Sequence, residues 1–331
     1  MMIRGKFFAV VMSLAFLGIM MFGQVSASTK AIDVSFALHT APNTPEHEAS
    51  IKFKEIVEAR SNGGMVVRLY PGAVLGGEKD NIEQLKVGEV ALAIFGDILP
   101  STLATEYAPT VIPFIYPNVE EVYKAWEGRL GDMMKKAILE RGGMMVVGLQ
   151  RRGARNLTAN KPVKVPADLR GIKLRVPEIP SWVRVWKELG AIPTPIAWPE
   201  VYNALQLNVV DAQENPYANV YTAKLYEVQK YLIHTEHLHN VFHWALSKKF
   251  YDKLSPEYQK IIIEAAKEAS EWGDRRSKEV DSDYLKKLKE LGMVVVDVDK
   301  SVFRKAALPA IKELAQSWAP GVWDEVKKYF D

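Results

Sequence analysis

Apolar and polar residues alternate in several stretches of the first hundred residues. In residues 32–38, Val34, Phe36 and Leu38 share one face of a strand, because successive side chains of a strand point to opposite sides. Apolar positions at helical spacing lie between such stretches. The predicted strands are residues 32–38, 65–70 and 90–95, and the predicted helices are residues 46–60 and 78–86. This β-α-β-α-β order predicts a parallel sheet with helices on its faces.

Similar patterns continue through the rest of the chain. Predicted strands cover residues 144–149 and 172–176, another begins at residues 209–211, and predicted helices cover residues 120–141, 181–189 and 199–207. The last third is mostly helical, and residues 256–291 keep a helical period until Gly292. Because a helix of that length exceeds the face of one small domain, we expect it to span two lobes.

These elements predict an α/β fold of two lobes, with mixed or parallel sheets flanked by helices. No single linker divides the chain, so we expect it to cross between the lobes more than once. Lobe 1 is expected to comprise residues 28–152, with roughly residues 241–280 returning to it. Lobe 2 is expected to comprise residues 153–240, with roughly residues 281–331 returning to it.

The first residues resemble a secretory signal peptide. Arg4 and Lys6 precede an apolar run at residues 7–22, and Val-Ser-Ala at residues 25–27 predicts cleavage after Ala27. The alternative is a membrane anchor, but the run is shorter than the roughly 20 residues that a spanning helix needs. No later segment has about 18 consecutive apolar residues. We therefore expect a mature protein outside the cytoplasm, in the periplasm.

Composition narrows the function classes. The 331 residues include no cysteine, which excludes a disulfide scaffold, a thiol nucleophile and an iron–sulfur site. Two of the 43 basic residues lie in residues 1–27, which contain no acidic residue, so the rest balances 41 basic against 40 acidic residues. This near-neutral balance gives no electrostatic footprint for nucleic acid. With 48% hydrophobic residues, the chain can bury a sizeable core.

Common catalytic signatures are absent, among them GxSxG, HExxH, the phosphate-binding P-loop and GxGxxG. A catalytic pair of carboxylates stays open, since no spacing selects one. Four of the six histidines lie between His234 and His243, a spacing that can hold a metal on a helix. The β-branched and aromatic residues around them favour a partly buried strand whose histidines donate hydrogen bonds, so we expect no metal site there. We also expect no cofactor.

One arginine stands where α/β folds bind ligands. Arg175 lies near the end of the strand at residues 172–176, opposite the apolar residues of that strand, and Pro177 ends the strand. A guanidinium there can hold a carboxylate through two parallel hydrogen bonds. The alternative is a surface arginine that pairs with Glu178 or Glu200.

Three more arginines follow the strand at residues 144–149. Arg155, in the turn Gly-Ala-Arg, is the better candidate for a ligand contact, and Arg151 and Arg152 are weaker ones. For Arg151 and Arg152 we favour the alternative, a charge at the surface or between the lobes.

Several motifs together resemble one family. The stretches GIKLRVP, LGAIPTPIAWPEVYNALQ, VVDAQENP and YEVQKYL follow one another in this order, and VRLYPGAVLGGEKD and VIPFIYPNVEE precede them. They are similar to the periplasmic substrate-binding subunit of tripartite ATP-independent periplasmic (TRAP) transporters, the DctP-type family. The resemblance covers essentially the whole mature chain, and the pair LRVP and QENP is its most specific part.

This resemblance implies a two-lobed periplasmic binding protein with a hinge. Such a protein closes on a small organic carboxylate, such as a sugar acid or a hydroxy or keto acid, and delivers it to the membrane subunits of a TRAP transporter. In the family, the arginine of LRVP clamps the carboxylate and the asparagine of QENP supports it, while an arginine of the G-x-R turn adds contacts. In this sequence these residues are Arg175, Asn215 and Arg155.

Other positions match pocket-lining sites of the sialic-acid-type members, namely His39, Asp97, Glu178, Trp198 and His237. Glu178 replaces an asparagine of those members, Trp198 a phenylalanine, and Asp97 a glutamate, and these differences argue against sialic acid. Asp97 and Glu178 can accept hydrogen bonds from hydroxyl or amino groups. Trp198 can cover one face of a ligand or, alternatively, fill the core under the hinge.

Two other functions stay open from the sequence. The chain could be the binding protein of an ATP-driven transporter or of a sensor kinase. It could also be a secreted hydrolase that uses carboxylates such as Asp97 and Glu178. Because no catalytic motif is present, we expect ligand binding without turnover.

Overall fold

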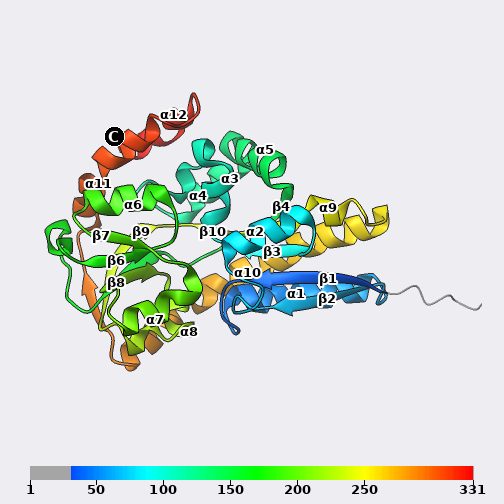
Figure 1. Cartoon of the computed structure of the whole chain (residues 1–331), viewed down its shortest axis with the longest axis horizontal. Helices are drawn as coiled ribbons and strands as arrows, with labels where there is room; N and C mark the ends of the chain where they lie inside the picture. Colours follow the sequence, from blue (N-terminus) through cyan, green and yellow to red (C-terminus); the bar gives the residue numbers. More distant parts are fainter. Residues whose placement is uncertain (1–30, 331) are drawn as a thin grey trace, which may run out of the picture. The chain divides into compact units, whose positions relative to one another are not determined.

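The computed structural model describes residues 31–330 (Figure 1). The predicted signal peptide, residues 1–27, lies outside the described residues. Within residues 31–330, no helix combines the length and the apolar character needed to cross a membrane.

The first sheet has five strands in the order β2-β1-β3-β10-β4. Its strands are β1 (Ile32–Leu38), β2 (Met65–Tyr70), β3 (Leu92–Phe95), β4 (Met144–Arg151) and β10 (Val241–Ser247). The strands β2, β1 and β3 are parallel, which confirms the prediction for the first part of the chain. Strand β10 returns from late in the sequence and pairs antiparallel with both β3 and β4.

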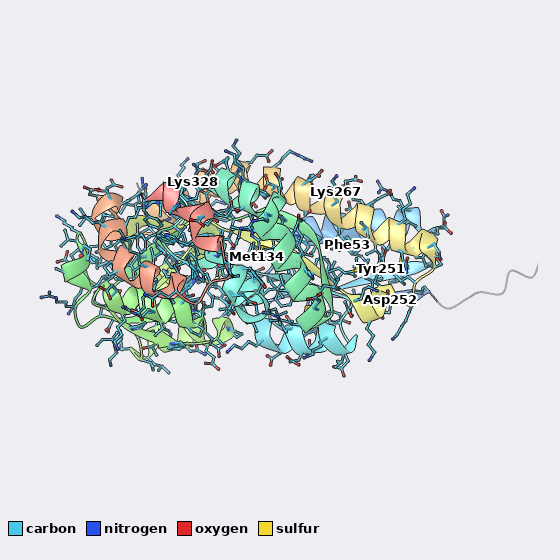
Figure 2. All side chains as sticks on the ribbon, turned by 90° about the horizontal axis from the view of Figure 1, so that it is seen from above. Phe53, Met134, Tyr251, Asp252, Lys267 and Lys328 are labelled. Carbon is cyan, nitrogen blue, oxygen red and sulfur yellow. The ribbon has the colours of Figure 1, made fainter. Side chains whose placement is uncertain are left out.

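Helices connect and cover this sheet. They are α1 (Pro45–Arg60), α2 (Glu78–Val87), α3 (Ile98–Leu103), α4 (Val119–Glu127), α5 (Arg129–Gly142) and α9 (Lys248–Tyr251). Under α1, the ring of Phe36 lies 5.4 Å from that of Phe53 and 5.2 Å from that of Trp244, in edge-on contacts. In Figure 2, Phe53 and Met134 lie within the packed side chains, whereas Lys267 and Lys328 lie on the outside.

The single helix expected at residues 120–141 is wrong. Gly128 has an extended backbone, with φ −97° and ψ −165°, and therefore ends α4 and begins α5. A side chain at Gly131 would meet the carbonyl oxygen of Trp126 at 1.8 Å, so the two helices approach closely at this glycine. The helical period continues through the break, which is why the pattern alone could not show it.

The second sheet has six strands in the order β11-β9-β5-β8-β6-β7. Its strands are β5 (Arg155–Ala159), β6 (Lys173–Val176), β7 (Ile192–Pro195), β8 (Ala212–Asn215), β9 (Tyr231–Leu238) and β11 (Val294–Asp297). Its helices are α6 (Pro180–Glu188), α7 (Val201–Gln206), α8 (Tyr217–Thr222), α11 (Lys300–Ala315) and α12 (Val322–Val326). The sheet is mixed, because β5 runs antiparallel to β8 and β9, whereas β6 runs parallel to β7 and β8.

Strands β5, β7 and β11 were not expected from the sequence. Strand β7 contains Pro193 and Pro195, which cannot donate ladder hydrogen bonds, and it occupies an edge of the sheet, where proline is tolerated. The extended segment expected around the histidines is confirmed, since it forms β9 and β10.

The chain passes between the sheets twice at one place. Residues 152–154 join β4 to β5, and residues 239–240 join β9 to β10. These segments touch, because the backbone N–H of Arg152 donates to the carbonyl of Asn240 at 3.3 Å. Helix α10 (Pro256–Glu290) packs against α1 and β4 beside the first sheet and against α8 beside the second.

The architecture is thus the two-lobed α/β fold that the sequence predicts, with the long helix in contact with elements of both lobes (Figure 1). The numerical lobe boundaries stay a prediction, since residues 31–331 form one compact unit.

Candidate functional site

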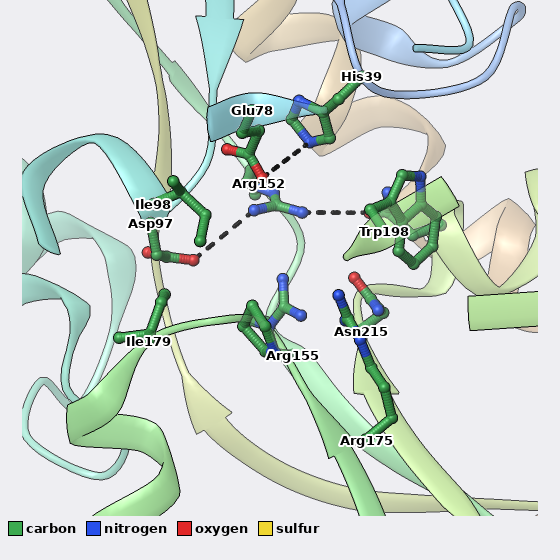
Figure 3. Close-up of a pocket in the computed structure, with 12 residues that line it drawn as sticks. His39, Glu78, Asp97, Ile98, Arg152, Arg155, Arg175, Ile179, Trp198 and Asn215 are labelled. Atoms are coloured by element: carbon green, nitrogen blue, oxygen red, sulfur yellow. Dashed lines mark hydrogen bonds and ion pairs between the residues drawn. The ribbon is translucent and has the colours of Figure 1, made fainter. Parts of the chain in front are cut away.

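A cleft lies between the two sheets, where loops after the strand ends converge (Figure 3). Counting the part open to solvent, it holds about 350 Å³ of empty space. Its lining residues are His39, Glu78, Asp97, Ile98, Arg152, Arg155, Arg175, Pro177, Ile179, Trp198, Asn215 and Asn219. Six of the eight predicted site residues are among them, and Glu178 and His237 are not. The position agrees with the rule that α/β sheets bind ligands beyond the carboxyl ends of their strands.

Glu78 and His39 form part of the wall that the first lobe contributes. Glu78 is the first residue of α2, and its Oε1 accepts a hydrogen bond from the backbone N–H of Gly96 at 2.7 Å. Its Oε2 lies 3.8 Å from Nε2 of His39, whose Nδ1 is 3.2 Å from the carbonyl of Ile94. Gly76 leads into this helix with φ +98°, a left-handed conformation that side chains rarely adopt. Glu78 was missed from the sequence.

Asp97 follows β3 and is buried in the same wall. Its Oδ2 accepts a hydrogen bond from the side-chain amide of Asn240 at 2.5 Å, and its Oδ1 has no partner among the described residues. Burial raises the pKa of Asp97 to about 6, although Arg152 and Arg155 act to lower it.

Arg152 lies at the crossing between the lobes, which is one of the two positions expected for it, and only 7% of it is exposed. Its guanidinium stacks 4.2 Å from the ring centre of Phe242 and contacts Asp97 at 3.8 Å and the amide oxygen of Asn219 at 3.4 Å. Its Nε has no partner among the described residues. Burial, together with the neighbouring Arg155, lowers the pKa of Arg152 to about 10. Arg151 instead lies further out and pairs with Glu120 at 2.7 Å.

Arg155, at the start of β5, is tied to Glu214 of β8. Its Nε donates to Oε2 of Glu214 at 2.6 Å, and its Nη2 donates to Oε1 and to the backbone carbonyl of Glu214, each at 2.8 Å. Burial alone would raise the pKa of Glu214, but Arg155 and the adjacent His237 lower it to about 2. Both side chains of the pair are almost fully buried.

His237 does not line the cleft, which corrects the expectation of a ligand contact. Its Nε2 lies 3.0 Å from Oε2 of Glu214, and its Nδ1 lies 2.8 Å from the hydroxyl of Thr235. Its ring packs against Trp186 and Phe114. Strand β9 therefore places it behind the Arg155–Glu214 pair, because the side chain points into the lobe.

Arg175, near the end of β6, has a different environment. Its Nε and Nη2 both donate to the backbone carbonyl of Ile196, at 2.9 and 2.6 Å. Among residues 31–330 it forms no ion pair, so the alternative pairing with Glu178 or Glu200 is wrong. Burial lowers the pKa of Arg175 to about 10, yet the group stays a cation at neutral pH. Its guanidinium lies 5.9 Å from the ring of Trp198.

Asn215 and Trp198 complete the side of the cleft next to Arg175 (Figure 3). Asn215 ends β8, and its amide nitrogen donates to Oε1 of Gln213 at 2.7 Å, which holds the side chain in one orientation. Trp198 begins a short 3-10 turn (Trp198–Glu200) and is only partly buried. It is therefore a wall residue of the cleft and not a core aromatic.

Glu178 lies outside the cleft and lines a neighbouring hollow, which shares Arg175 and Trp198 with the cleft. Its Oε1 accepts a hydrogen bond from Nζ of Lys79 at 2.8 Å. Lys79 belongs to α2 and Glu178 follows β6, so this half-exposed ion pair links the two lobes. Asp97 and Glu178, the two carboxylates named for the hydrolase alternative, do not line the same hollow.

His234 of β9 and His243 of β10 form hydrogen bonds from their strands, as expected for this segment. His234 lies 2.8 Å from Oδ1 of Asp297, and Nδ1 of His243 lies 3.0 Å from the carbonyl of Gly96. Across residues 31–330, no group of three or more histidine or carboxylate side chains is arranged to hold a metal ion.

The cleft as a whole can bind a small anion that also carries hydrogen-bonding groups. Its second-lobe side offers guanidinium and amide donors, and its first-lobe side offers carboxylate acceptors. Ile98, Pro177, Ile179 and Trp198 supply the apolar surface. A carboxylate that leaves water for such a site needs charge-assisted hydrogen bonds, which a buried arginine provides.

Comparison with known proteins relates this cleft to a family. A profile described as "Bacterial extracellular solute-binding protein, family 7" matches residues 36–317. A solute-binding protein of Roseobacter denitrificans is 35% identical over 265 residues, which are 80% of this chain and 81% of that protein. The 2,3-diketo-L-gulonate-binding periplasmic protein of Escherichia coli is 30% identical over 291 residues, which are 87% of this chain and 88% of that protein.

Solved structures agree with the sequence matches. The crystal structure of a TRAP periplasmic solute binding protein from Roseobacter denitrificans, with bound L-galactonate, superposes with a TM-score of 0.85 at 31% identity. The superposition covers 92% of this chain and 100% of that chain.

Proposed function

The chain belongs to family 7 of the bacterial extracellular solute-binding proteins, and we infer that it is the binding subunit of a TRAP transporter that captures a sugar acid in the periplasm. The predicted signal peptide supports the periplasmic location. Relatives with bound L-galactonate or with specificity for 2,3-diketo-L-gulonate support a hydroxylated acid as the ligand.

One observation carries this proposal: Arg175 is a buried cation without a carboxylate partner within residues 31–330. A buried charge is unfavourable unless it is paired, so the site is incomplete until an anion arrives. Its free donors face the cleft beside Arg155 and Asn215 (Figure 3). In the proposed complex, the ligand carboxylate lies against Arg175 and is supported by Asn215 and Arg155.

The adjacent crossings at residues 152–154 and 239–240 support a hinge between the lobes. Closure brings the first-lobe wall against the hydroxyl end of the ligand. Small-angle X-ray scattering of the mature protein should show a smaller radius of gyration at ligand saturation. An unchanged radius at saturation would contradict closure on binding.

The direct test is calorimetric titration of the mature protein with L-galactonate and with galactitol, which replaces the carboxylate by a neutral hydroxymethyl group. We expect binding of the acid and none of the alcohol. Arg175→Ala should abolish acid binding in a protein that remains folded by circular dichroism. Binding of galactitol with similar affinity would refute the carboxylate clamp.

A second measurement addresses turnover. The ligand is incubated with the protein, recovered after denaturation and examined by mass spectrometry. We expect the same mass and the same chromatographic retention as the input acid. A new product that depends on the protein would show an enzyme and contradict the transport role.

A further inference from the structure

The charged side chains of the cleft divide by lobe. Glu78 and Asp97 come from the first lobe, and Arg155 and Arg175 come from the second. Arg152 lies at the crossing between them (Figure 3). A ligand in the cleft therefore meets a basic end and an acidic end.

The three buried arginines of the cleft differ in whether each has a carboxylate partner. Arg155 is neutralised by Glu214 through two carboxylate hydrogen bonds. Arg152 has Asp97 within 3.8 Å. Arg175 alone has no carboxylate partner among the described residues of the cleft. One anionic group on the ligand is thus enough to pair every buried cation.

We propose, as a refinement that rests on the sugar-acid function above, that the cleft admits one carboxylate only and rejects ligands with a second carboxylate at the far end. The acidic side chains of Glu78 and Asp97 make this choice. The favoured ligand carries its carboxylate at Arg175 and a hydroxyl at the acidic end.

The hydrogen-bonding chemistry of the acidic end explains the choice. A hydroxyl both donates and accepts, so it can donate to Glu78 or Asp97 and accept from Arg152. A second carboxylate only accepts, and it would face two like charges in a desolvated site. Arg152 cannot offset both, because it carries a single positive charge and already lies 3.8 Å from the carboxylate of Asp97.

A matched pair of ligands tests the proposal. L-galactonate and galactarate share one carbon skeleton and differ in whether the terminal carbon is a hydroxymethyl or a carboxylate group. Titration at pH 8 keeps all carboxylates ionised, and we expect galactarate to bind about a hundredfold more weakly or worse. D-erythronate and meso-tartrate provide the same comparison on a four-carbon chain.

Substitutions of Glu78 and Asp97 should reduce the difference in affinity between galactonate and galactarate. Asp97→Asn and Glu78→Gln each remove one like charge and keep the shape, so each should reduce the preference for galactonate by about tenfold. If one of these two variants does not fold, the other still tests the proposal. Asp252→Asn, which changes an exposed carboxylate paired with Lys248, should leave the preference as in the wild type.

The possible results distinguish a failure of the one-carboxylate selection from a failure of the sugar-acid function. If galactonate and galactarate bind within about threefold of each other, the selection against a second carboxylate is wrong and the sugar-acid function stands. A preference that persists undiminished in both variants also overturns the role of Glu78 and Asp97. If no member of either ligand pair binds, the proposed function itself fails, and this inference falls with it.

Discussion

Two strands of the second sheet, β5 and β6, present arginines that are equally buried, each 3% exposed, but differently paired. On β5, Arg155 forms a closed network with Glu214 and, behind it, His237. On β6, Arg175 meets only the backbone carbonyl of Ile196. The comparison shows that burial alone does not define a ligand-binding arginine. Arg155 is paired within the fold, whereas Arg175 has no carboxylate partner among the described residues, and this difference is the basis of its proposed ligand role.

The carboxylates of the site show the same contrast. Glu214 sits against Arg155 and has a pKa lowered to about 2, whereas Asp97 has an incomplete set of partners and a pKa raised to about 6. In both cases burial opposes ionisation of the carboxyl group, and only for Glu214 do the neighbouring charges outweigh burial and lower the pKa. The two environments therefore respond in opposite ways to mutation and to pH.

The largest expected effect is the loss of stability on substitution of Arg155, which is paired with Glu214. Arg155→Met should lower the free energy of unfolding by about 3–5 kcal/mol, because it leaves Glu214 buried without a counter-ion. Urea denaturation measures the loss. The double variant Arg155→Met/Glu214→Leu should recover much of it, since the orphaned charge is gone. If the single variant stays within about 1 kcal/mol of the wild type, Arg155 is not a structural ion pair.

Substitutions of the unpaired Arg175 should change the affinity for the ligand and not lower the stability of the ligand-free protein. Arg175→Lys should weaken sugar-acid binding by about a hundredfold, because an ammonium cannot reproduce two parallel hydrogen bonds in a fixed fork. Arg175→Met should leave the ligand-free protein as stable as the wild type or more so. Calorimetry and urea denaturation check the two halves. Wild-type affinity in Arg175→Lys would contradict the bidentate clamp.

Asp97 should make stability depend on pH. Its pKa is about 6 in the folded protein and near 3.8 when unfolded, so the folded state binds more protons between these values, and stability falls as pH rises from 4 to 6. Asp97→Asn should remove this fall and gain about 1–3 kcal/mol at pH 7. Glu214 has the opposite sign, and its contribution is lost as pH falls from about 4.5 towards 2. Chemical denaturation from pH 3 to 8 measures the Asp97 effect and the upper part of the Glu214 effect, and an unchanged pH slope in Asp97→Asn would count against the assignment.

In the proposed complex, Asn215 supports the ligand carboxylate as a neutral donor, so its loss should weaken binding less than the loss of Arg175. Asn215→Ala should weaken binding by about 1–3 kcal/mol. Its amide also bonds Gln213, so thermal unfolding of the ligand-free variant serves as the control. Undiminished affinity would remove Asn215 from the site.

The smallest effect concerns the Lys79–Glu178 pair, which joins the two lobes outside the cleft. The side chains are 52% and 35% exposed, so the pair should contribute at most about 1 kcal/mol to the closed form. Lys79→Ala should speed ligand release by up to about fivefold at low salt, and the difference should vanish near 1 M salt. Stopped-flow measurement of the dissociation rate tests this. A difference that persists at high salt would show that the pair acts through packing.

Much of the site could be predicted because it lies in short motifs. Arg175 lies near the end of β6 and Asn215 ends β8, in motifs that the pattern or the resemblance marked, and both line the cleft. Glu78 was missed, since a glutamate that begins a helix is usually solvated. His237 was expected to line the cleft but lies behind it. Strand β9 has two faces, and the sequence does not say which one meets the cleft.

The sequence by itself determined the α/β class, the first parallel sheet, the long helix and the arginine of LRVP, because hydrophobic period and strand-end motifs are local properties. Only the tertiary structure decided which buried charges are paired. Arg155 and Glu214 lie 59 positions apart, and Asp97 meets Asn240 across 143 positions. The mixed strand order of the second sheet sets the Arg155–Glu214 contact, so the difference in pairing between Arg155 and Arg175 exists only once that sheet has formed.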